Sequence, residues 1–189
     1  MNGNRLLVGV SGASGAPLAV ALLKALREVG VESHLILSSG AEPIVLEETG
    51  LSSEAFRALA DVVYDARDLG AAPASGTWKC LGMAVVPCSM KTAAGIHSGY
   101  SDNLLLRAAD VTLKERRPLA LVPRECPMGA IHLRNLYELS QMGADILPPV
   151  LSYYNGLATV EEMERHLVGK ILDRFGLELP GFRRWEGRT

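Results

Sequence analysis

The chain has 189 residues, of which 48% are hydrophobic and 21% are charged, and its net charge at pH 7 is −2. This length and composition predict one domain over residues 1–189 that buries about two-thirds of its unfolded surface, and they argue against disorder. The near-neutral charge excludes a general basic surface for nucleic acid, so any anion site must be local.

Cysteine, histidine and hydropathy patterns narrow the class of protein further. Cys80, Cys88 and Cys126 form no CxxC pair, which favours a reducing cytoplasm over a disulfide scaffold. The four histidines lack the spacing of metal ligands, so we expect no metal site. No apolar run approaches the ~20 residues that cross a bilayer. We therefore expect a cytoplasmic protein that is not inserted in a membrane.

The first half of the chain predicts alternating strands and helices. An apolar strand over residues 6–10 ends at the turn SGASGAP, and Pro17 then suits the first turn of a helix that continues to Gly30. A second strand over 31–38 precedes a short helix over 41–50. From residue 51 to 78 the pattern weakens, and we expect only a small helix over 53–60.

The second half repeats the alternation. Strands are predicted over 82–89, 118–123 and 144–149, and helices over 92–99, 102–115, 130–143 and 159–176. Strands that alternate with helices of this length indicate an α/β fold with a mostly parallel sheet and helices on both faces.

In such a sheet, ligands bind outside the carboxyl ends of the strands, at the point where the strand order reverses. The unusual turns of this chain follow the predicted strands directly, so we expect them to meet at that edge: SGASG, the pair Ser38 and Ser39, PCSMKT, and PRECP.

Two of these turns are rich in hydroxyl groups. The turn around Ser14 lacks the GxGxxG spacing of a dinucleotide site, and strand two ends in serines where such a site needs an acidic residue. Hydroxyls and helix N–H groups suit a mononucleotide phosphate. The simpler alternatives are that the glycine turn only packs a helix on a strand, and that Ser89 and Thr92 only cap a helix. Two such turns on one edge favour a shared ligand.

Charged residues flank the strand LALV. Arg107 and Lys114 are seven residues apart, which places both on one face of a helix, and Arg124 and Glu125 follow the strand. A carboxylate among cations in a strand-end cleft suits an acid/base group that serves an anionic substrate, and a surface ion-pair network is an equal alternative. Tyr154 follows the last strand, where a phenol either reaches a ligand or packs.

Several segments together resemble the UbiX-type flavin prenyltransferases over nearly the whole chain: SGASGA, ASGT, PCSMKTAAGI, RAADVTLKERRPLALVPRE and IHL. The SGT, PCSMKT and RRWEG segments are similar to the B subunits of phenolic-acid (4-hydroxybenzoate) decarboxylase systems.

The resemblance implies a Rossmann-like (flavodoxin-like) three-layer sandwich that forms a homo-oligomer, commonly a dodecamer. It implies that FMN and dimethylallyl phosphate bind between subunits and that the dimethylallyl group is joined to N5 and C6 of reduced FMN. The prenylated FMN would serve a UbiD-type decarboxylase. No metal is implied, because fixed cations stabilise the leaving phosphate.

The resemblance also implies roles for individual residues. Ser14, Glu48, Lys114 and Glu125 are the expected catalytic residues, with Ser14 relaying the N5 proton and Glu125 transferring a proton during ring closure. The flavin side comprises Gly12, Ala13, Ser14, Ser38, Ser89, Thr92 and Arg107. The prenyl-phosphate cluster comprises Lys114, Arg124, Tyr154 and Lys170. The tail from about residue 176 is expected to pack on a neighbouring subunit.

Three departures from the family pattern bear on the rate and the prenyl-donor preference, and one of them is Tyr153-Tyr154-Asn155 in place of Phe-Tyr-His. Lys170 stands where many members have Arg, which replaces a bidentate group with a point charge. Cys126 and Gly129 alter the loop beside Glu125. The alternatives are an FMN-dependent cysteine decarboxylase of the related fold and a non-catalytic FMN-binding accessory subunit.

Overall fold

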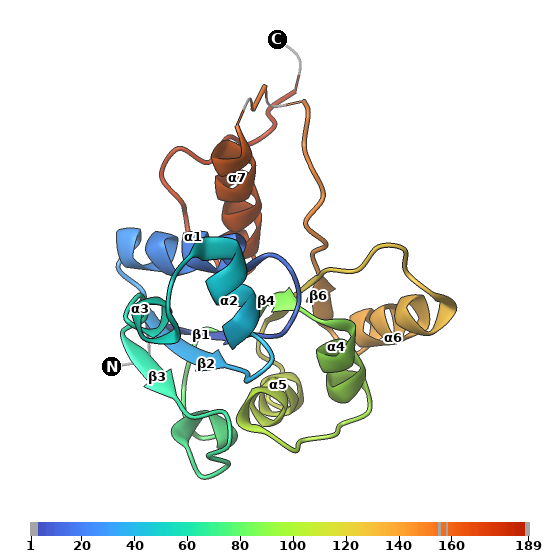
Figure 1. The fold of residues 1–189 in the computed structure, drawn as a ribbon. Helices are drawn as coiled ribbons and strands as arrows, with labels where there is room; N and C mark the ends of the chain where they lie inside the picture. The colour runs from blue at the N-terminus through green and yellow to red at the C-terminus, as the bar shows by residue number, and fades with distance from the viewer. Residues whose placement is uncertain (1–3, 155, 158, 188–189) are drawn as a thin grey trace.

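A computed structural model of the chain describes residues 4–154, 156–157 and 159–187. The described residues form one six-stranded sheet in the order β3-β2-β1-β4-β5-β6, and every neighbouring pair is parallel (Figure 1). The strands are β1 (Arg5–Val10), β2 (Glu32–Leu37), β3 (Val62–Tyr64), β4 (Met83–Cys88), β5 (Leu119–Pro123) and β6 (Ala144–Ile146). The predicted α/β fold with a parallel sheet is confirmed.

The helices connect these strands. They are α1 (Ala16–Glu28), α2 (Glu42–Thr49), α3 (Ser53–Arg57), α4 (Met90–His97), α5 (Leu104–Lys114), α6 (Ala130–Gln141) and α7 (Val160–Asp173), with a 3-10 turn η1 (Ala72–Ala74). Gly50 ends α2 in the left-handed conformation, with φ of 69°. None of the helices among the described residues is long and apolar enough to cross a bilayer.

Strand β3 was not predicted from the sequence, and neither was the short turn η1. β3 has three residues, two of them partly buried, and among the described strands it pairs with β2 alone. A strand of this length shows too little alternation to be recognised, and the pairing with β2 supplies its backbone hydrogen bonds. β3 positions Tyr64 at the carboxyl edge of the sheet.

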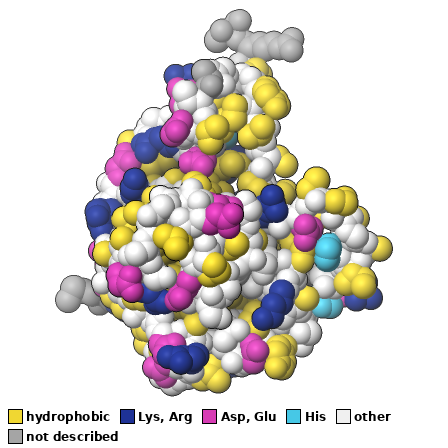
Figure 2. Space-filling model, in the orientation of Figure 1, with side chains coloured by type: hydrophobic (Ala, Val, Ile, Leu, Met, Phe, Trp, Pro, Cys, Tyr) yellow, Lys and Arg dark blue, Asp and Glu magenta, His cyan; other side chains and the backbone are white. Residues whose placement is uncertain are grey.

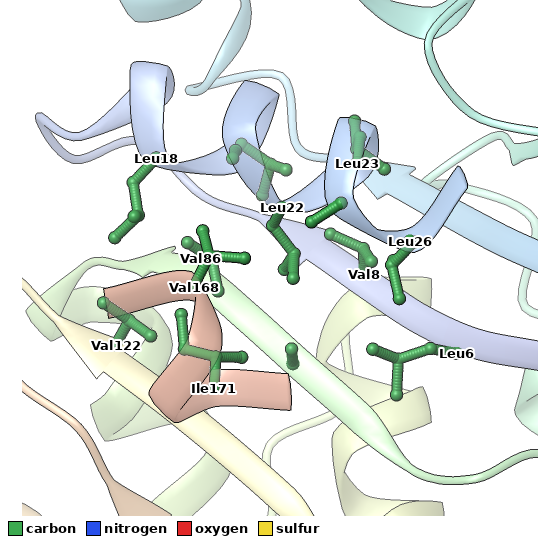
Figure 3. Packing of buried hydrophobic residues seen from close by; sticks show 14 of the residues in the cluster. Leu6, Val8, Leu18, Leu22, Leu23, Leu26, Val86, Val122, Val168 and Ile171 are labelled. Atoms are coloured by element: carbon green, nitrogen blue, oxygen red, sulfur yellow. The ribbon is translucent and has the colours of Figure 1, made fainter. Parts of the chain in front are cut away.

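Alternating residues of the strands face two separate cores. Leu6 and Val8 of β1 face α1, α2 and α7, whereas Leu7 faces the layer of α4, α5 and α6. Figure 3 shows Leu18, Leu22 and Leu26 of α1 meeting the strands and α7. Each fully buried leucine contributes about 1.5–3 kcal/mol. The two cores produce the predicted three-layer sandwich, with helices on opposite sides of the sheet (Figure 1).

The strand order reverses at β1. β1 pairs with β2 on one side and with β4 on the other, so the chain leaves β1 and β4 in opposite directions. The turns that follow these two strands therefore border a crevice at the carboxyl edge. This crevice holds the hydroxyl-rich turns predicted from the sequence.

The C-terminal tail packs on α7 of its own chain. Leu179 is buried in the core, and the Phe182 ring lies so close to Gly169 that a side chain at this position would collide with it. Arg184 pairs with Asp173 at the end of α7. The Trp185 side chain remains 62% exposed. The expected contact of the tail with a neighbouring subunit stays a prediction. Such a contact would involve the side of the tail that faces away from α7.

Candidate active site

The larger of two cavities at the carboxyl edge has a volume of about 790 Å³. Its polar wall comes from the strand-end turns and includes Gly12, Ser38, Ser39, Ser89 and Thr92. Its apolar wall comes from Leu37, Val63, Leu105 and Leu106. This size and mixture are typical of a site for a cofactor-sized ligand.

Gly12 allows two backbone segments to approach one another beside this cavity. A Cβ at Gly12 would lie only 2.7 Å from the carbonyl oxygen of Gly40. Any side chain at position 12 would therefore push apart the turns that follow β1 and β2. Glycine is required here for packing, and both Gly12 and Gly40 line the cavity.

Ser11 joins the two halves of the crevice and was not predicted from the sequence. Its buried hydroxyl donates to the carbonyl of Pro87 at 2.9 Å and accepts the N–H of Ser89 at 2.7 Å. Its own N–H also donates to the Pro87 carbonyl at 3.2 Å. These bonds fix the start of α4 relative to the turn after β1. They depend on the adjacency of β1 and β4, which no local pattern shows.

Ser89 caps α4, so the simpler of its two predicted roles is confirmed. Its hydroxyl accepts the N–H of Thr92 at 3.2 Å and donates to the Thr92 hydroxyl at 3.0 Å. Because Thr92 accepts this bond, its own hydroxyl hydrogen can point elsewhere. Both residues also line the larger cavity, where Thr92 can donate to a ligand.

Ser14, Glu48 and Arg124 line the second cavity, whose volume is about 430 Å³. One oxygen of Glu48 accepts the backbone N–H groups of Gly15 and Ala16, each at 2.8 Å. Burial acts to raise the pKa of Glu48, but hydrogen bonds from Ser14, Gly15 and Ala16 and the charge of Arg124 outweigh it and lower that pKa. Glu48 is therefore ionised at neutral pH.

Tyr64 is a further cavity residue that the sequence did not indicate. It lines the larger cavity, and its hydroxyl lies 2.9 Å from Nδ1 of His34. Burial raises the pKa of Tyr64 and lowers that of His34, so both side chains are neutral near pH 7. The pair holds the Tyr64 ring at the cavity wall.

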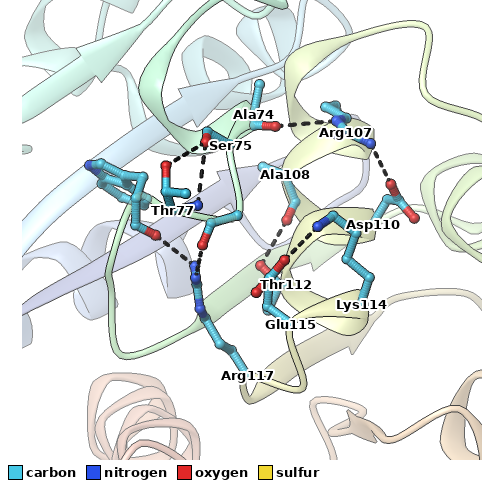
Figure 4. A network of polar contacts seen from close by, with 12 residues as sticks. Ala74, Ser75, Thr77, Arg107, Ala108, Asp110, Thr112, Lys114, Glu115 and Arg117 are labelled. Atoms are coloured by element: carbon cyan, nitrogen blue, oxygen red, sulfur yellow. Dashed lines mark hydrogen bonds and ion pairs between the residues drawn. The ribbon is translucent and has the colours of Figure 1, made fainter.

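Arg107 and Lys114 lie away from both cavities of this chain. As predicted, they share a face of α5 (Figure 4). Arg107 donates to the Ala74 carbonyl at 3.3 Å and pairs with Asp110 at 2.8 Å. Lys114 lies beside Gly76 and pairs with Glu115. Lys114 ends the helix that precedes β5, whereas Arg124 follows β5. The two cations are therefore at opposite edges of the sheet.

Arg117 has a structural role. It donates to the carbonyls of Trp78 and Gly76, which holds the loop after η1 against the end of α5 (Figure 4). This loop carries the ASGT segment.

The remaining predicted residues are dispersed over the chain. Glu125 accepts the N–H of Cys126 at 3.1 Å and does not line the cavity that Arg124 lines. Tyr154 is exposed and contacts His166 and Trp185 edge-on. Lys170 is exposed in the last turn of α7. Ala13 donates its N–H to the Ser11 carbonyl within the turn.

The described residues contain no group of three or more His, Cys, Asp or Glu side chains that could hold a metal ion. Charged side chains line both cavities: Glu42, Arg57, Asp65, Arg67 and Lys91 at the larger one, and Glu48, Arg124 and Glu164 at the smaller one.

Comparisons with known proteins identify the family of the chain. A model of the flavoprotein family matches residues 1–176. A probable UbiX-like flavin prenyltransferase from Streptomyces sp. (strain D7) is 52% identical over 97% of this chain and 92% of that protein. A dodecameric FMN-dependent UbiX-like decarboxylase from Escherichia coli O157:H7 is 50% identical with a TM-score of 0.94, covering 97% of this chain and 100% of that one.

Two further structures help to separate the alternatives. AnUbiX (PadA1), solved in complex with FMN and dimethylallyl pyrophosphate, is 46% identical with a TM-score of 0.95, covering 98% of each chain. The peptidyl-cysteine decarboxylase EpiD is 16% identical with a TM-score of 0.64 over 80% of this chain and 84% of that one, which shows a shared fold alone. The extent and level of these identities show that the chain belongs to the flavoprotein family and, within it, to the UbiX-like flavin prenyltransferases.

Proposed function

We propose that this protein joins the dimethylallyl group of dimethylallyl phosphate to N5 and C6 of reduced FMN. The observation that carries the proposal is the pair of cavities on either side of one turn, with Gly12 at the larger and Ser14 at the smaller. One turn therefore contacts both a cofactor-sized site and a smaller site that contains Arg124. A two-substrate transfer needs this arrangement.

The larger cavity suits FMN. Its hydroxyl groups and the N-terminus of α4 suit a phosphate and a ribityl chain, and its apolar wall suits a flavin ring. Gly12, Ser38, Ser89 and Thr92 would hold the cofactor, with Ala13 and Ser14 in the adjoining turn. Reduced FMN supplies the nucleophilic atoms N5 and C6.

Ser14 and Glu48 suit the transfer of the N5 proton. Ser14 and the ionised Glu48 line the same cavity, and Glu48 can accept the Ser14 hydroxyl, which leaves the lone pairs of the Ser14 oxygen available to accept a proton from a ligand. Ser14 can pass its own proton to Glu48 at the same time. As N5 bonds to C1 of the prenyl group, the C1–O bond breaks and its electron pair leaves with the phosphate. Ring closure bonds prenyl C3 to flavin C6: the C2=C3 double bond is consumed as C2 takes up a proton, and flavin C6 gives one up. We assign this exchange of protons to Glu125.

Arg124 suits the leaving phosphate. A single cation is not enough to stabilise the charge of that phosphate in a site without a metal ion. Lys114, at the opposite edge of the sheet, reaches the same phosphate only if it comes from another chain. We infer that Lys114, Tyr154 and Lys170 complete the prenyl-phosphate site across subunit contacts, and that Arg107 of a neighbouring chain serves the flavin phosphate in the same way.

Exposed apolar side chains support an oligomer. Ile131, Leu133 and Tyr137 of α6 and Val150 and Leu151 after β6 are each more than half exposed. Figure 2 shows apolar side chains gathered over the α6 projection. Surfaces of this kind mark protein contacts. We propose a homo-oligomer, with a dodecamer as the specific form.

We further propose that the product, prenylated FMN, serves a UbiD-type decarboxylase and that the protein is cytoplasmic. The three cysteines, all free, support a reducing compartment.

Anaerobic incubation of the protein with reduced FMN and dimethylallyl phosphate, followed by mass spectrometry of the flavin, tests the main proposal. We expect a flavin heavier by the added five-carbon group, and turnover that a chelator does not abolish. An unmodified flavin that stays bound would indicate an accessory FMN-binding subunit. Oxidation of a C-terminal peptidyl cysteine by the FMN-loaded protein would instead indicate a cysteine decarboxylase.

A further inference from the structure

Glu164 of α7 lies where the 430 Å³ cavity meets a second groove of about 470 Å³. The cavity and the groove share Pro17, Glu48 and Glu164, so they adjoin one another. Glu164 thus borders the space that we assign to the prenyl donor, although no motif pointed to it.

The carboxylates outnumber the cations on the cavity wall. Among the described residues that line it, Arg124 is the cation, and Glu48 and Glu164 are the acids. Arg124 lowers the pKa of Glu48, so its charge already acts on that carboxylate. The part of the cavity wall that one chain supplies therefore carries a net negative charge when both acids are ionised, and the lysines that we assign to neighbouring chains offset it at the phosphate.

The surroundings of Glu164 do not neutralise its charge. Burial raises its pKa, and the charge of Glu161 on the same helix raises it further. The nearest cation in sequence, Arg165, binds both oxygens of Glu28 on α1 at 3.0 and 2.9 Å. Lys24 lines the groove beyond, and the described residues show no ion pair to Glu164.

We propose that Glu164 is a specificity-determining residue that selects the donor by charge, disfavouring an allylic diphosphate relative to the monophosphate. The inference rests on the proposed function and names the substrate class of the same site. A diphosphate carries about one more negative charge than a monophosphate near neutral pH. An ionised carboxylate on the cavity wall therefore repels it more strongly.

The test compares kcat/KM for dimethylallyl monophosphate and diphosphate in wild type and Glu164→Gln, under anaerobic conditions with reduced FMN. We expect Glu164→Gln to shift the ratio toward the diphosphate by about tenfold at low salt, the effect of one unit charge at a partly shielded site. The shift should shrink as salt rises. Calorimetry with inorganic pyrophosphate and phosphate gives a readout without turnover, and the same change in relative affinity is expected.

Glu161→Gln is the matched control, because it removes one negative charge from the same helix and lines only the groove. We expect it to leave the donor ratio unchanged. An unchanged ratio in Glu164→Gln, or an equal shift in both variants, overturns the local role of Glu164. If the wild-type protein prenylates FMN with neither donor, both the proposed function and this inference fail. That result is distinguishable from an active wild type in which Glu164→Gln leaves the donor ratio unchanged.

Discussion

Glu48 holds the turn after β1 by accepting the N–H groups of Gly15 and Ala16, each at 2.8 Å, on one carboxylate oxygen. These N–H groups begin α1, where a helix leaves its first donors without partners inside the helix. Because Gly15 provides no side-chain cap, a carboxylate from α2 does so, and it also compensates the positive end of the helix dipole.

We predict that Glu48→Gln destabilises the fold by about 1–3 kcal/mol, since hydrogen bonds to an ionised acceptor are replaced by weaker ones. Denaturant unfolding at neutral pH measures the loss. Glu47→Gln is the matched control: it changes an exposed neighbour on the same helix and should leave the stability close to wild type. Equal stability of the two variants would contradict this role of Glu48.

The same bonds predict a pH dependence of stability. The pKa of Glu48 is lowered from its ordinary value of 4.5 in the folded chain. The Glu48 carboxylate therefore binds a proton more readily in the unfolded chain than in the folded one. The contribution of Glu48 to stability is therefore complete above pH 4.5, and it is lost as the pH falls from 4.5 through the lower pKa of Glu48 in the folded chain. Urea unfolding of wild type and Glu48→Gln over this range should show the two stabilities converging toward acid. A constant difference would be inconsistent with an ionised Glu48 cap.

We predict that Glu125→Gln retains FMN but slows product formation by about 10²–10⁴, the usual cost of losing a general acid or base. Single-turnover kinetics with reduced FMN and dimethylallyl phosphate measure the rate, and flavin absorbance checks binding. Glu138→Gln on α6 changes a carboxylate whose ion pair is with His97, so it serves as a control. Unaltered single-turnover kinetics in Glu125→Gln would remove this residue from the mechanism.

The positions of Lys114 and Arg124 at opposite edges of the sheet predict complementation between subunits. Lys114→Ala and Arg124→Ala should each lower kcat and kcat/KM, because a phosphate that gathers charge in the transition state loses a cation. Oligomers assembled from equal amounts of both variants should regain activity at about a quarter of the sites if the chains mix at random. Flavin affinity should remain near wild type in Lys114→Ala.

Mixed oligomers that form, as native mass spectrometry can verify, and yet stay as inactive as the parents would contradict a site shared between chains. Loss of FMN from a folded Lys114→Ala oligomer would instead place Lys114 at the flavin phosphate.

Lys170→Arg should retain or raise activity, and Lys170→Ala should lower it. A guanidinium restores bidentate contact with phosphate, whereas a lysine acts as a point charge. Steady-state kinetics with dimethylallyl phosphate measure both variants. Lys24→Ala on α1 removes an exposed cation elsewhere and should have little effect. Wild-type kinetics in Lys170→Ala would exclude contact with the donor.

Local patterns in the sequence determined most of the secondary structure and one edge of the site. Continuous apolar runs such as residues 6–10 predict buried parallel strands, and Ser89 and Gly50 mark a helix start and a helix end through bonds made within a few residues. The placement of Ser14, Ser38 and Ser89 at strand ends follows from the same alternation, because carboxyl ends of parallel strands share an edge.

Contacts between distant segments decided the rest. The pairing of β1 with β4 brings Ser11 to Ser89, and the packing of α2 beside α1 brings Glu48 to the Gly15 turn. The packing of α7 beside the carboxyl edge of the sheet places Glu164 at the cavity. Residues that are neighbours in sequence can also lie apart in the structure. Arg124 lines the same cavity as Glu48, whereas the side chain of Glu125 accepts the N–H of Cys126 and does not line that cavity. These relations depend on strand order and on packing in three dimensions, which a local pattern of residues does not encode.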